Sequence, residues 1–584
     1  MKKQTKLIMA LSTSAMLSAI AALTSFAASG WIEENCGWAY YEENGERVTE
    51  DWVKSGNDWF WMDSSGQMAA EQLLEIDNNY YYLQQNGAMA HDQWVALDNK
   101  NADQEGEPEQ YWYYFQDNGK ACKRPDSASS GSIKTKEIDG KKYTFDAEGR
   151  MLYGWVSDGE RQTGEDAWKD CDYYFGPEGD GAMRRGWDRI RVEADPEDEM
   201  MPGDGLWDDE QQERWFYFSS SGKKTRGKPD RLVQKTIDGQ KYGFDECGRM
   251  ISSWYADPDL ITTDIYDKNV SAEENLTARQ GGSLYTKEFM YFGSPESGAR
   301  YSKGWFRATP SRYLMESKHL DNETYSYYAD GDGNLYANEI RTIDGERYGF
   351  DNYGRLISGL VCLEMEDKGT SSRIINTWYQ DKEGREFSDE EKFEELLDYE
   401  RRVGGYLRES FADEIYNHKR RFYFFSGPNS SALTGKQIVK LGDQSFEFMF
   451  EDSGYLKGSG VNGKKDGRLY RAGWLLKPEE EQKYAIIRQE SVSEENPHTN
   501  VLFKYKKLDK MEVEDFIAEV CNSGIYNEKK EETVWTVRYD PPGVKYYLIG
   551  PNGDIVKNKK NAVDVDGYEF KVKSEKIQSI TVEE

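Results

Sequence analysis

Tryptophan recurs on a seven-residue spacing near the beginning of the chain. In the stretch GWIEENCGWAYYEENGERVTEDWVKSGNDWFWMDSSGQM, residues 30–68, the spacing is kept by Trp31, Trp38, Gly45, Trp52, Trp59 and Gly66, and it continues through Leu73, Tyr80, Gly87 and Trp94. An indole ring offers an apolar surface for core packing and a negative π face that attracts cations. The spacing therefore raises two possibilities for the same rings, namely core packing and ligand binding.

The seven-residue spacing does not indicate a coiled coil, because Gly takes every third place in it and aromatic clusters interrupt any helical pattern. The centre of the unit is repeated as DWFWMDSSGQM (58–68), NYYYLQQNGAM (79–89) and YWYYFQDNGKA (111–121). Alternating aromatic residues beside a polar Gly turn predict β-hairpins, and Gly supplies the positive φ that a tight turn requires.

A second repeat of about 100 residues lies over the first. Its near copies are IDGKKYTFDAEGRMLYGW (138–155), IDGQKYGFDECGRMISSW (237–254) and IDGERYGFDNYGRLISGL (343–360). Weaker copies of the hairpin continue to the C-terminal end. Because a single hairpin is not stable in water, each copy must bury its aromatic residues against its neighbours. The sequence predicts a mainly β fold, an elongated solenoid of stacked β-hairpin repeats with small helical insertions.

The sequence divides into five parts. We expect a signal peptide at 1–27, a repeat region at 28–476 with a helical insertion at about 387–420, a charged mixed segment at 477–540, and degenerate hairpin repeats at 541–584. The insertion begins with a capping box at Ser388 and Glu391. Helices are expected only near 389–402 and 511–522.

The chain carries a formal charge of −32, with 107 acidic and 75 basic residues. This charge argues against nucleic acid and against anionic lipid as partners, and favours a cationic or neutral one. Three lysines precede an apolar run that ends in a small-residue cleavage pattern at Ala27, which predicts export and no membrane span after cleavage. The expected location is the exterior, secreted or on the cell-wall surface.

Motifs of catalysis are not visible in the sequence. No GxSxG, HExxH or P-loop occurs, the six cysteines form no CxxC, and the four histidines are not clustered. We therefore expect a protein that is not an enzyme, with no catalytic residue, no metal site and no cofactor.

The repeat resembles the choline-binding or cell-wall-binding repeat of Gram-positive surface proteins and cell-wall enzymes. The resemblance lies in two Trp seven residues apart, the second opening an aromatic cluster, followed by Gly-x-Met and a further Trp. It is close over 30–94, degenerate over 111–360 and faint beyond. Gly-x-Met recurs at Met68, Met89, Met151, Met183 and Met250.

The resemblance implies ligand sites between consecutive hairpins, where two Trp of one repeat and one aromatic residue of the next surround a quaternary ammonium group. Such a group cannot donate hydrogen bonds, so its recognition depends on π faces and shape. Two complete sets are implied, one of Trp31, Trp38 and Trp61, the other of Trp52, Trp59 and Tyr82. Later copies lose an aromatic residue, at Leu73, Thr144, Asp172 and Gly243.

The implied function is non-catalytic attachment of an exported protein to the cell wall. The implied partner is a wall polymer, a choline-substituted teichoic acid or a glycan. A second hypothesis is a surface protein that binds carbohydrate (glucan) by stacking aromatic rings on sugar rings. Choline should release the protein from wall material under the first hypothesis, and glucan under the second.

Overall fold

The computed structural model describes residues 29–34, 37–104, 106–125, 127–128, 133–193, 211–228, 232–256, 283–311, 314–365, 373–378, 420–426, 428–441, 444–495, 502–538 and 541–583. The predicted signal peptide and most of the predicted helical insertion at 387–420 lie outside these ranges. The chain forms two units. Unit 1 comprises 1–193 and 213–225, and unit 2 comprises 194–212 and 226–584.

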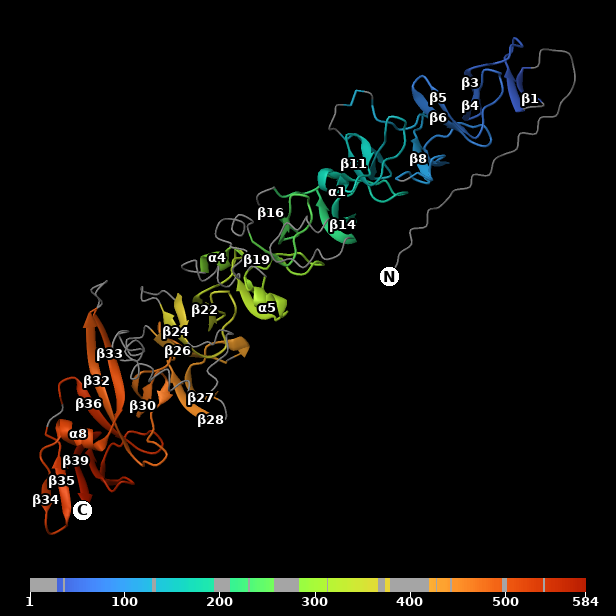
Figure 1. Cartoon of the computed structure of the whole chain (residues 1–584). Coiled ribbons are helices and arrows are strands. Elements are labelled where there is room, and N and C mark those ends of the chain that lie inside the picture. Colours follow the sequence, from blue (N-terminus) through green and yellow to red (C-terminus); the bar gives the residue numbers. More distant parts are fainter. Residues whose placement is uncertain are drawn as a thin grey trace. The chain divides into compact units, whose positions relative to one another are not determined.

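Unit 1 consists mainly of two-stranded antiparallel hairpins that follow one another along the chain, from blue to green in Figure 1. Its strands are β1 (Gly30–Glu34), β2 (Gly37–Tyr41), β3 (Asp51–Ser55), β4 (Asp58–Met62), β5 (Gln72–Ile76), β6 (Asn79–Leu83), β7 (Gln93–Asp98), β8 (Gln110–Phe115), β9 (Thr135–Ile138), β10 (Lys141–Thr144), β11 (Trp155–Ser157), β12 (Glu160–Gln162), β13 (Tyr173–Tyr174), β14 (Gly186–Glu193) and β15 (Gln211–Phe218). The prediction of a mainly β protein built from hairpin repeats is confirmed.

Two kinds of sequence signal form each hairpin. Successive residues of a strand point to opposite faces, so Trp59 and Trp61 share one face of β4 while Phe60 lies on the other. The two-residue turns contain left-handed residues, as at Asp139 (φ 49°) and Gly140 (φ 77°) between β9 and β10. Positive φ at both turn residues matches the twist of the paired strands, which is why Asp-Gly recurs at these turns.

A backbone hydrogen bond joins each hairpin of unit 1 to the next. We call the third residue of Gly-x-Met, or its equivalent, the junction position; it follows the second strand of a hairpin. Its N–H donates to a carbonyl of the preceding hairpin over 2.7–2.8 Å, in the pairs Met68 to Trp38, Met89 to Trp59, Ala121 to Tyr80, Met151 to Trp112, Met183 to Lys142 and Lys224 to Asp172. The regular junction explains how a chain of small sheets buries a continuous series of rings.

Two physical constraints explain why glycine occupies the turn after the second strand of most repeats. Gly119 has φ +74°, and a Cβ atom there would lie 2.2 Å from Sδ of Met89, the junction residue of the preceding hairpin. Gly87 stands in the same way over Met68, Gly181 over Met151 and Gly222 over Met183. The Gly of one repeat and the Met of the repeat before it are therefore a packed pair, in addition to the turn geometry that Gly permits.

Unit 2 continues the hairpins and then forms wider sheets. Its hairpin strands are β16 (Val233–Ile237), β17 (Gln240–Phe244), β18 (Trp254–Tyr255), β19 (Met290–Tyr291), β20 (Gly304–Ala308), β21 (Tyr325–Ala329), β22 (Glu339–Ile343), β23 (Glu346–Phe350), β24 (Gly359–Met365), β25 (Ile374–Trp378) and β26 (Arg420–Phe425). One five-stranded sheet follows, of β27 (Gly435–Leu441), β28 (Gln444–Phe450), β31 (Trp474–Leu475), β30 (Arg468–Arg471) and β29 (Gly463–Lys465).

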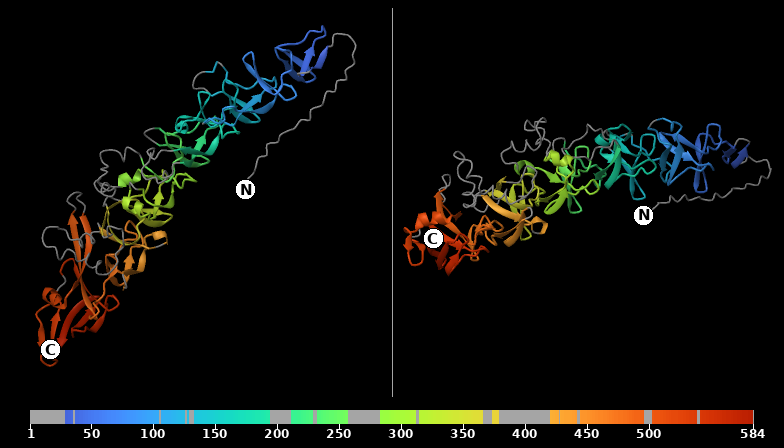
Figure 2. Two further views of the ribbon diagram at one scale, coloured as in Figure 1. Left: turned by 45° about the vertical axis from the view of Figure 1, so that its right-hand side comes forward. Right: turned by 60° about the horizontal axis from the view of Figure 1, so that its bottom comes forward.

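The last part of unit 2 has its own core. Its strands are drawn in orange and red in Figure 2. Strands β33 (Leu502–Met511), β32 (Ala485–Glu495) and β36 (Val544–Ile549) form one sheet, and β34 (Ile525–Asn527), β35 (Glu532–Thr536), β39 (Lys576–Glu583), β38 (Glu569–Lys573) and β37 (Lys559–Val563) form another. Both sheets combine strands from before and after residue 540. The segments predicted separately at 477–540 and 541–584 are thus interleaved in the same sheets.

The helices in the described ranges are short. The predicted helix at 511–522 is α8 (Val513–Val520), which buries Phe516 and Val520 one turn apart against the C-terminal core. Three further short helices, α1 (Ala167–Asp170), α4 (Ser283–Lys287) and α5 (Glu316–Leu320), and a 3₁₀ turn at Pro428–Ser430 were not predicted. The expectation that helices occur only near 389–402 and 511–522 is therefore wrong, because segments of four or five residues are too short to show a helical period.

Candidate functional site

A series of three-ring contacts runs through the hairpins of unit 1. Trp52 of β3 lies opposite Trp61 of β4, with ring centroids 5.2 Å apart, and Tyr81 of the next hairpin approaches Trp52 to 5.0 Å. In the same way Trp31 contacts Tyr40 across its own hairpin at 5.3 Å and Phe60 of the next at 5.0 Å. We call this series the aromatic seam. Its rings meet edge to face, the favoured arrangement of aromatic pairs.

The direct ring contacts do not coincide with the two predicted sets of rings. The ring contacts of Trp31 are with Tyr40 and Phe60, while Trp61 contacts Trp52. A cation held between rings needs room between them, so direct contact is not the test of a binding site. The assignment of the six residues to ligand binding stays a prediction.

Trp38 is the second residue of β2, and Trp59 is the second residue of β4. Each lies close to its hairpin turn, on the strand face that carries the aromatic seam. Trp38 lies opposite Glu33, and Trp59 lies opposite Lys54. Trp59 is 39% exposed, whereas Trp52 and Trp61 of the same hairpin are half-buried. The Nζ atom of Lys54 lies 5.7 Å from the centroid of the Trp59 ring. An exposed indole face with an ammonium group above it is the geometry of a cation–π contact.

Tyr82, the predicted third member of the second set, faces the following hairpin. It lies opposite Leu73 and its ring is 6.2 Å from that of Phe115. The residues that the sequence reasoning missed are Tyr40, Phe60 and Tyr81, which supply the direct ring contacts. The alternation of strand faces could have indicated Tyr40, since it is the residue paired with Trp31.

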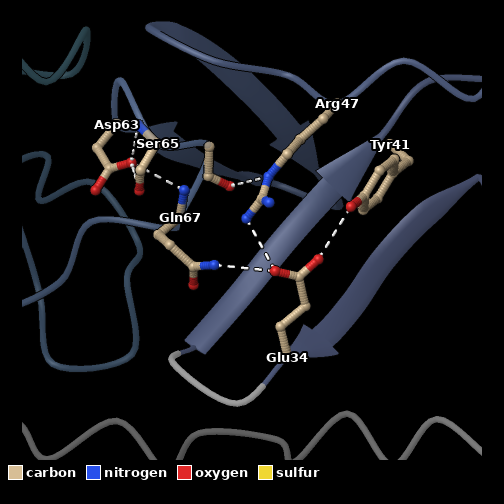
Figure 3. A network of polar contacts seen from close by, with 7 residues as sticks. Glu34, Tyr41, Arg47, Asp63, Ser65 and Gln67 are labelled. Atoms are coloured by element: carbon tan, nitrogen blue, oxygen red, sulfur yellow. Dashed lines mark hydrogen bonds and ion pairs between the residues drawn. The ribbon is translucent and has the colours of Figure 1, made fainter.

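A polar network fixes the first hairpin against the second (Figure 3). The carboxylate of Glu34 accepts hydrogen bonds from Tyr41 Oη (3.0 Å), Arg47 (3.0 Å) and Gln67 Nε2 (3.1 Å). The hydrogen bond to Glu34 is the main reason that the pKa of Tyr41 is raised. Because Gln67 belongs to the second hairpin, Glu34 helps to set the distance between the two hairpins that carry Trp38 and Trp59.

A cleft of about 740 Å³ lies elsewhere in unit 1, beside the β7–β8 and β11–β12 hairpins. Its volume is in the range of small-molecule sites, roughly 300–1,000 Å³. Tyr111, Trp112 and Tyr153 are among its lining residues. The guanidinium of Arg150 lies 4.6 Å over the ring of Tyr111, and that of Arg161 lies 3.9 Å over the ring of Tyr153. Two aromatic faces of the cleft are therefore covered by the chain's own cations.

Carboxylates alternate with these cations around the cleft. Asp146, Glu148 and Glu160 line it, and burial raises the pKa of Asp146 to about 6 against the opposing hydrogen bond and charge of Arg150. Arginine can only donate hydrogen bonds, whereas an ionised carboxylate can only accept them. A lining that mixes the two suits a ligand whose groups both donate and accept, such as the hydroxyls of a sugar.

No helix in the described ranges is long and apolar enough to span a membrane. No protein-family model matches the chain, and no curated protein matches it.

Solved structures of three proteins from Streptococcus pneumoniae are similar to this chain. The modular autolysin LytC is 16% identical with a TM-score of 0.29; the match covers 64% of this chain and 59% of LytC, so the chain spans about three fifths of that protein. Choline-binding protein F is 15% identical with a TM-score of 0.27, covering 73% and 98%. The choline-binding domain of CbpL is 16% identical with a TM-score of 0.22, covering 54% and 100%.

These identities and TM-scores are too low for the superpositions to support any inference about function. The resemblance rests on the chain's own repeats, with their seven-residue aromatic spacing, their Gly-x-Met turns and their regular junctions. The chain is a mainly β protein whose hairpin repeats resemble those of the choline-binding repeat family.

Proposed function

We propose that this protein is exported and attaches, without catalysis, to a cell-wall polymer through the aromatic rings between its first hairpins. The ligand is a quaternary ammonium group such as the choline of a substituted teichoic acid. The rings that contact it are those of the two predicted sets, and Trp59 supplies the exposed face among them.

The observation that carries this proposal is the surface of Trp59. Its ring is 39% exposed, and the Lys54 ammonium lies 5.7 Å from the ring centroid. An indole face that attracts the chain's own ammonium group also attracts an external one, and a methylated ammonium loses less hydration when it leaves water. The acidic composition of the chain adds a favourable long-range field for a cationic ligand.

Replacing Trp38 and Trp59 together by alanine should strongly weaken binding to choline-bearing wall. A desolvated cation–π contact contributes about 2 kcal/mol, which corresponds to roughly a 30-fold change in affinity for each site. Several such sites on one polymer increase the loss further through multivalency. Retention on purified wall, with and without added choline, measures the effect. Replacing Lys54 by glutamine should act in the opposite direction, because it removes a competing ammonium group from Trp59.

The control is the double substitution of Trp187 and Trp215, whose rings are 6.4 Å apart and whose partner in the predicted pattern is Gly243. It should reduce stability more than wall binding. If the Trp38 and Trp59 double variant stays folded and binds wall as tightly as the unchanged protein, the rings belong to the core alone and the proposal is wrong.

The cleft of unit 1 supports a second candidate function, recognition of a wall glycan. Its mixed donors and acceptors suit sugar hydroxyls, as described above. Replacing Glu160 by glutamine should weaken binding of a peptide-free glycan oligosaccharide by several-fold, because a charge-assisted hydrogen bond is replaced by a neutral one. Isothermal titration measures this affinity.

The matched control for Glu160 is Glu346. Both follow an Asp-Gly hairpin turn with similar φ angles, 53° and 79° for Asp158 and Gly159, 51° and 87° for Asp344 and Gly345. Glu346→Gln should leave the glycan affinity unchanged. Equal effects of the two substitutions, or none from either, would remove the cleft from consideration as a glycan site.

A further inference from the structure

Lys224 occupies the junction position after β15, where four other repeats of unit 1 carry methionine and one carries Ala121. Its backbone N–H donates to the carbonyl of Asp172 over 2.7 Å, as Met89 donates to Trp59 over 2.8 Å. Asp172 accordingly occupies the place of Trp59 in its repeat. This junction thus has a carboxylate where another has an exposed indole ring, and a lysine where others have a thioether.

The side chain of Lys224 is buried, with the residue only 3% exposed. Its Nζ atom lies 4.7 Å from the ring centroid of Trp155 and 5.6 Å from that of Phe216. The same Nζ donates a hydrogen bond to the carbonyl of Trp168, in α1. Two ring faces and a carbonyl therefore surround an ammonium group that has left water, which is where cation–π attraction is strongest.

The rings around Lys224 are those of the aromatic seam. Trp155 lies opposite Tyr174 in its hairpin with centroids 4.8 Å apart, and Phe216 of the next hairpin lies 5.5 Å from Trp155. The same arrangement occurs upstream at the β3–β4 hairpin, where Trp52, Trp61 and Tyr81 correspond to Trp155, Tyr174 and Phe216. The seam thus has an ammonium-binding arrangement of rings at a junction where the sequence reasoning had found only a lost aromatic residue, Asp172.

We propose that the Trp155 junction is an ammonium site occupied by the chain's own Lys224, closed to external ammonium ligands and opened to them when the lysine side chain is shortened. The residue at the junction position then determines which junctions of the seam can take a ligand. The proposal extends the proposed function to a junction that lies outside the two predicted sets.

The exclusion of an external cation follows from occupancy and charge. An ammonium group already fills the space between Trp155 and Phe216, and a second cation there would meet like-charge repulsion in a poorly solvated place. Shortening Lys224 to alanine removes three methylene groups and the ammonium, and this missing fragment corresponds to n-propylammonium. The rings remain, and so does the carbonyl of Trp168, which accepts the ammonium's hydrogen bond.

Chemical rescue tests this directly in the full-length chain. The Lys224→Ala substitution is made in a background that also carries Trp38→Ala and Trp59→Ala, so that ligand binding at the first hairpins does not contribute. Thermal unfolding is followed with n-propylammonium chloride, with 1-propanol and with sodium chloride at equal ionic strength. At a ligand concentration ten times Kd, the ratio of folded to unfolded protein should rise about tenfold.

The expected result is a saturable stabilisation of the Lys224→Ala chain by n-propylammonium, absent in the parent background and absent with 1-propanol. Adding Trp155→Ala should abolish it. Equal stabilisation by n-propylammonium and 1-propanol, equal responses of variant and parent, or no response from a folded variant would each overturn the proposal. Because the background lacks Trp38 and Trp59, failure here is distinct from failure of wall binding in the unchanged protein.

A second measurement needs no shortened side chain and covers a variant that fails to fold. In the chain labelled with ¹³C-lysine, the Cε protons of Lys224 should be shifted upfield by the Trp155 ring, and this signal should disappear in Lys224→Met. Neighbouring Lys223, whose side chain is 59% exposed, is the internal control, and its Cε protons should have the chemical shift of an exposed lysine. A spectrum in which every lysine Cε proton signal has the chemical shift of an exposed lysine would overturn the proposal.

Discussion

Replacing Gly119 by alanine is expected to lower the free energy of unfolding of unit 1 by about 2–4 kcal/mol. The left-handed backbone at φ +74° costs a residue with a Cβ atom about 1–2 kcal/mol. The new Cβ would also lie 2.2 Å from Sδ of Met89, and overpacking of this kind costs about 1–3 kcal/mol. Met89 is itself buried beside Tyr81 and Leu83, so it has little room to move. Urea unfolding followed by Trp fluorescence measures the change.

The turn between β9 and β10 provides the matched control. Gly140 has φ +77°, and a Cβ atom there would meet nothing within 4 Å. Gly140→Ala should therefore cost only the backbone part, about 1–2 kcal/mol. In a double-mutant cycle, Met89→Ala should make Gly119→Ala less costly, since it removes the atom that clashes. If Gly119→Ala proves no worse than Gly140→Ala, the Gly–Met pair does not hold the hairpins together.

Replacing Asp351 by asparagine is expected to destabilise unit 2 by about 3–5 kcal/mol, the usual cost of leaving a buried charge unpaired. Asp351 Oδ2 accepts from Arg355 Nε at 2.7 Å, and the two side chains are 7% and 10% exposed. Burial disfavours the charged guanidinium, but the charge and hydrogen bond of Asp351 outweigh it and hold the pKa of Arg355 above its ordinary value. Asparagine can keep the turn bonds from the backbone amides of Tyr353 and Arg355 through its Oδ1 atom. Its amide NH2 group cannot accept from Arg355 Nε, so the substitution removes both the charge and that hydrogen bond.

Two comparisons isolate the contribution of the buried ion pair. The double substitution Asp351→Asn with Arg355→Met should recover most of the loss, because neither side chain then carries an unpaired charge. Asp452→Asn removes an exposed partner of Lys465, which also binds Glu451, and should cost less than about 1 kcal/mol. Chemical unfolding of each variant gives the free energies. If Asp351→Asn lowers the free energy of unfolding as little as Asp452→Asn does, the Arg355 guanidinium is not left unpaired in the variant and the account of the buried pair is wrong.

The periodic features of the fold could be predicted from the sequence. The aromatic clusters and the positive-φ glycines, such as Gly66 and Gly87, identified the hairpins because strand alternation and turn geometry are local. The helix at 513–520 was found for the same reason, since Phe516 and Val520 lie one turn apart. The three short helices and 3₁₀ turn leave no comparable local pattern.

Features set by distant partners could not be predicted. β32 pairs with β36, about 50 residues further along the chain, and no local signal in either strand specifies the other. The direct ring contacts of the candidate site show the same limit. The resemblance places Trp31 and Trp61 in one set, which stays a prediction, whereas the ring contact between Trp61 and Trp52 follows from cross-strand register.

Lys224 illustrates what neither spacing nor register reveals alone. In the sequence it is one lysine of a Lys-Lys pair after a Gly turn, with no sign that it differs from Lys223. In the structure Lys224 is 3% exposed and covered by rings, while the side chain of Lys223 is 59% exposed and lies 3.3 Å from Asp172. The difference follows from strand alternation together with the junction hydrogen bond, which directs one of the two side chains into the seam.

The most direct test of ligand binding by the aromatic seam is a choline titration of ¹⁵N-labelled protein, observed through the indole Nε1–H signals. The signals of Trp38 and Trp59 should move and saturate together at the choline concentration that releases the protein from wall material. The signal of Trp155 should stay in place, because the Lys224 ammonium lies 4.7 Å from its ring centroid and occupies that junction. If Trp38 and Trp59 do not move while choline still releases the protein, the rings of the first hairpins are core residues and ligand binding lies elsewhere in the chain.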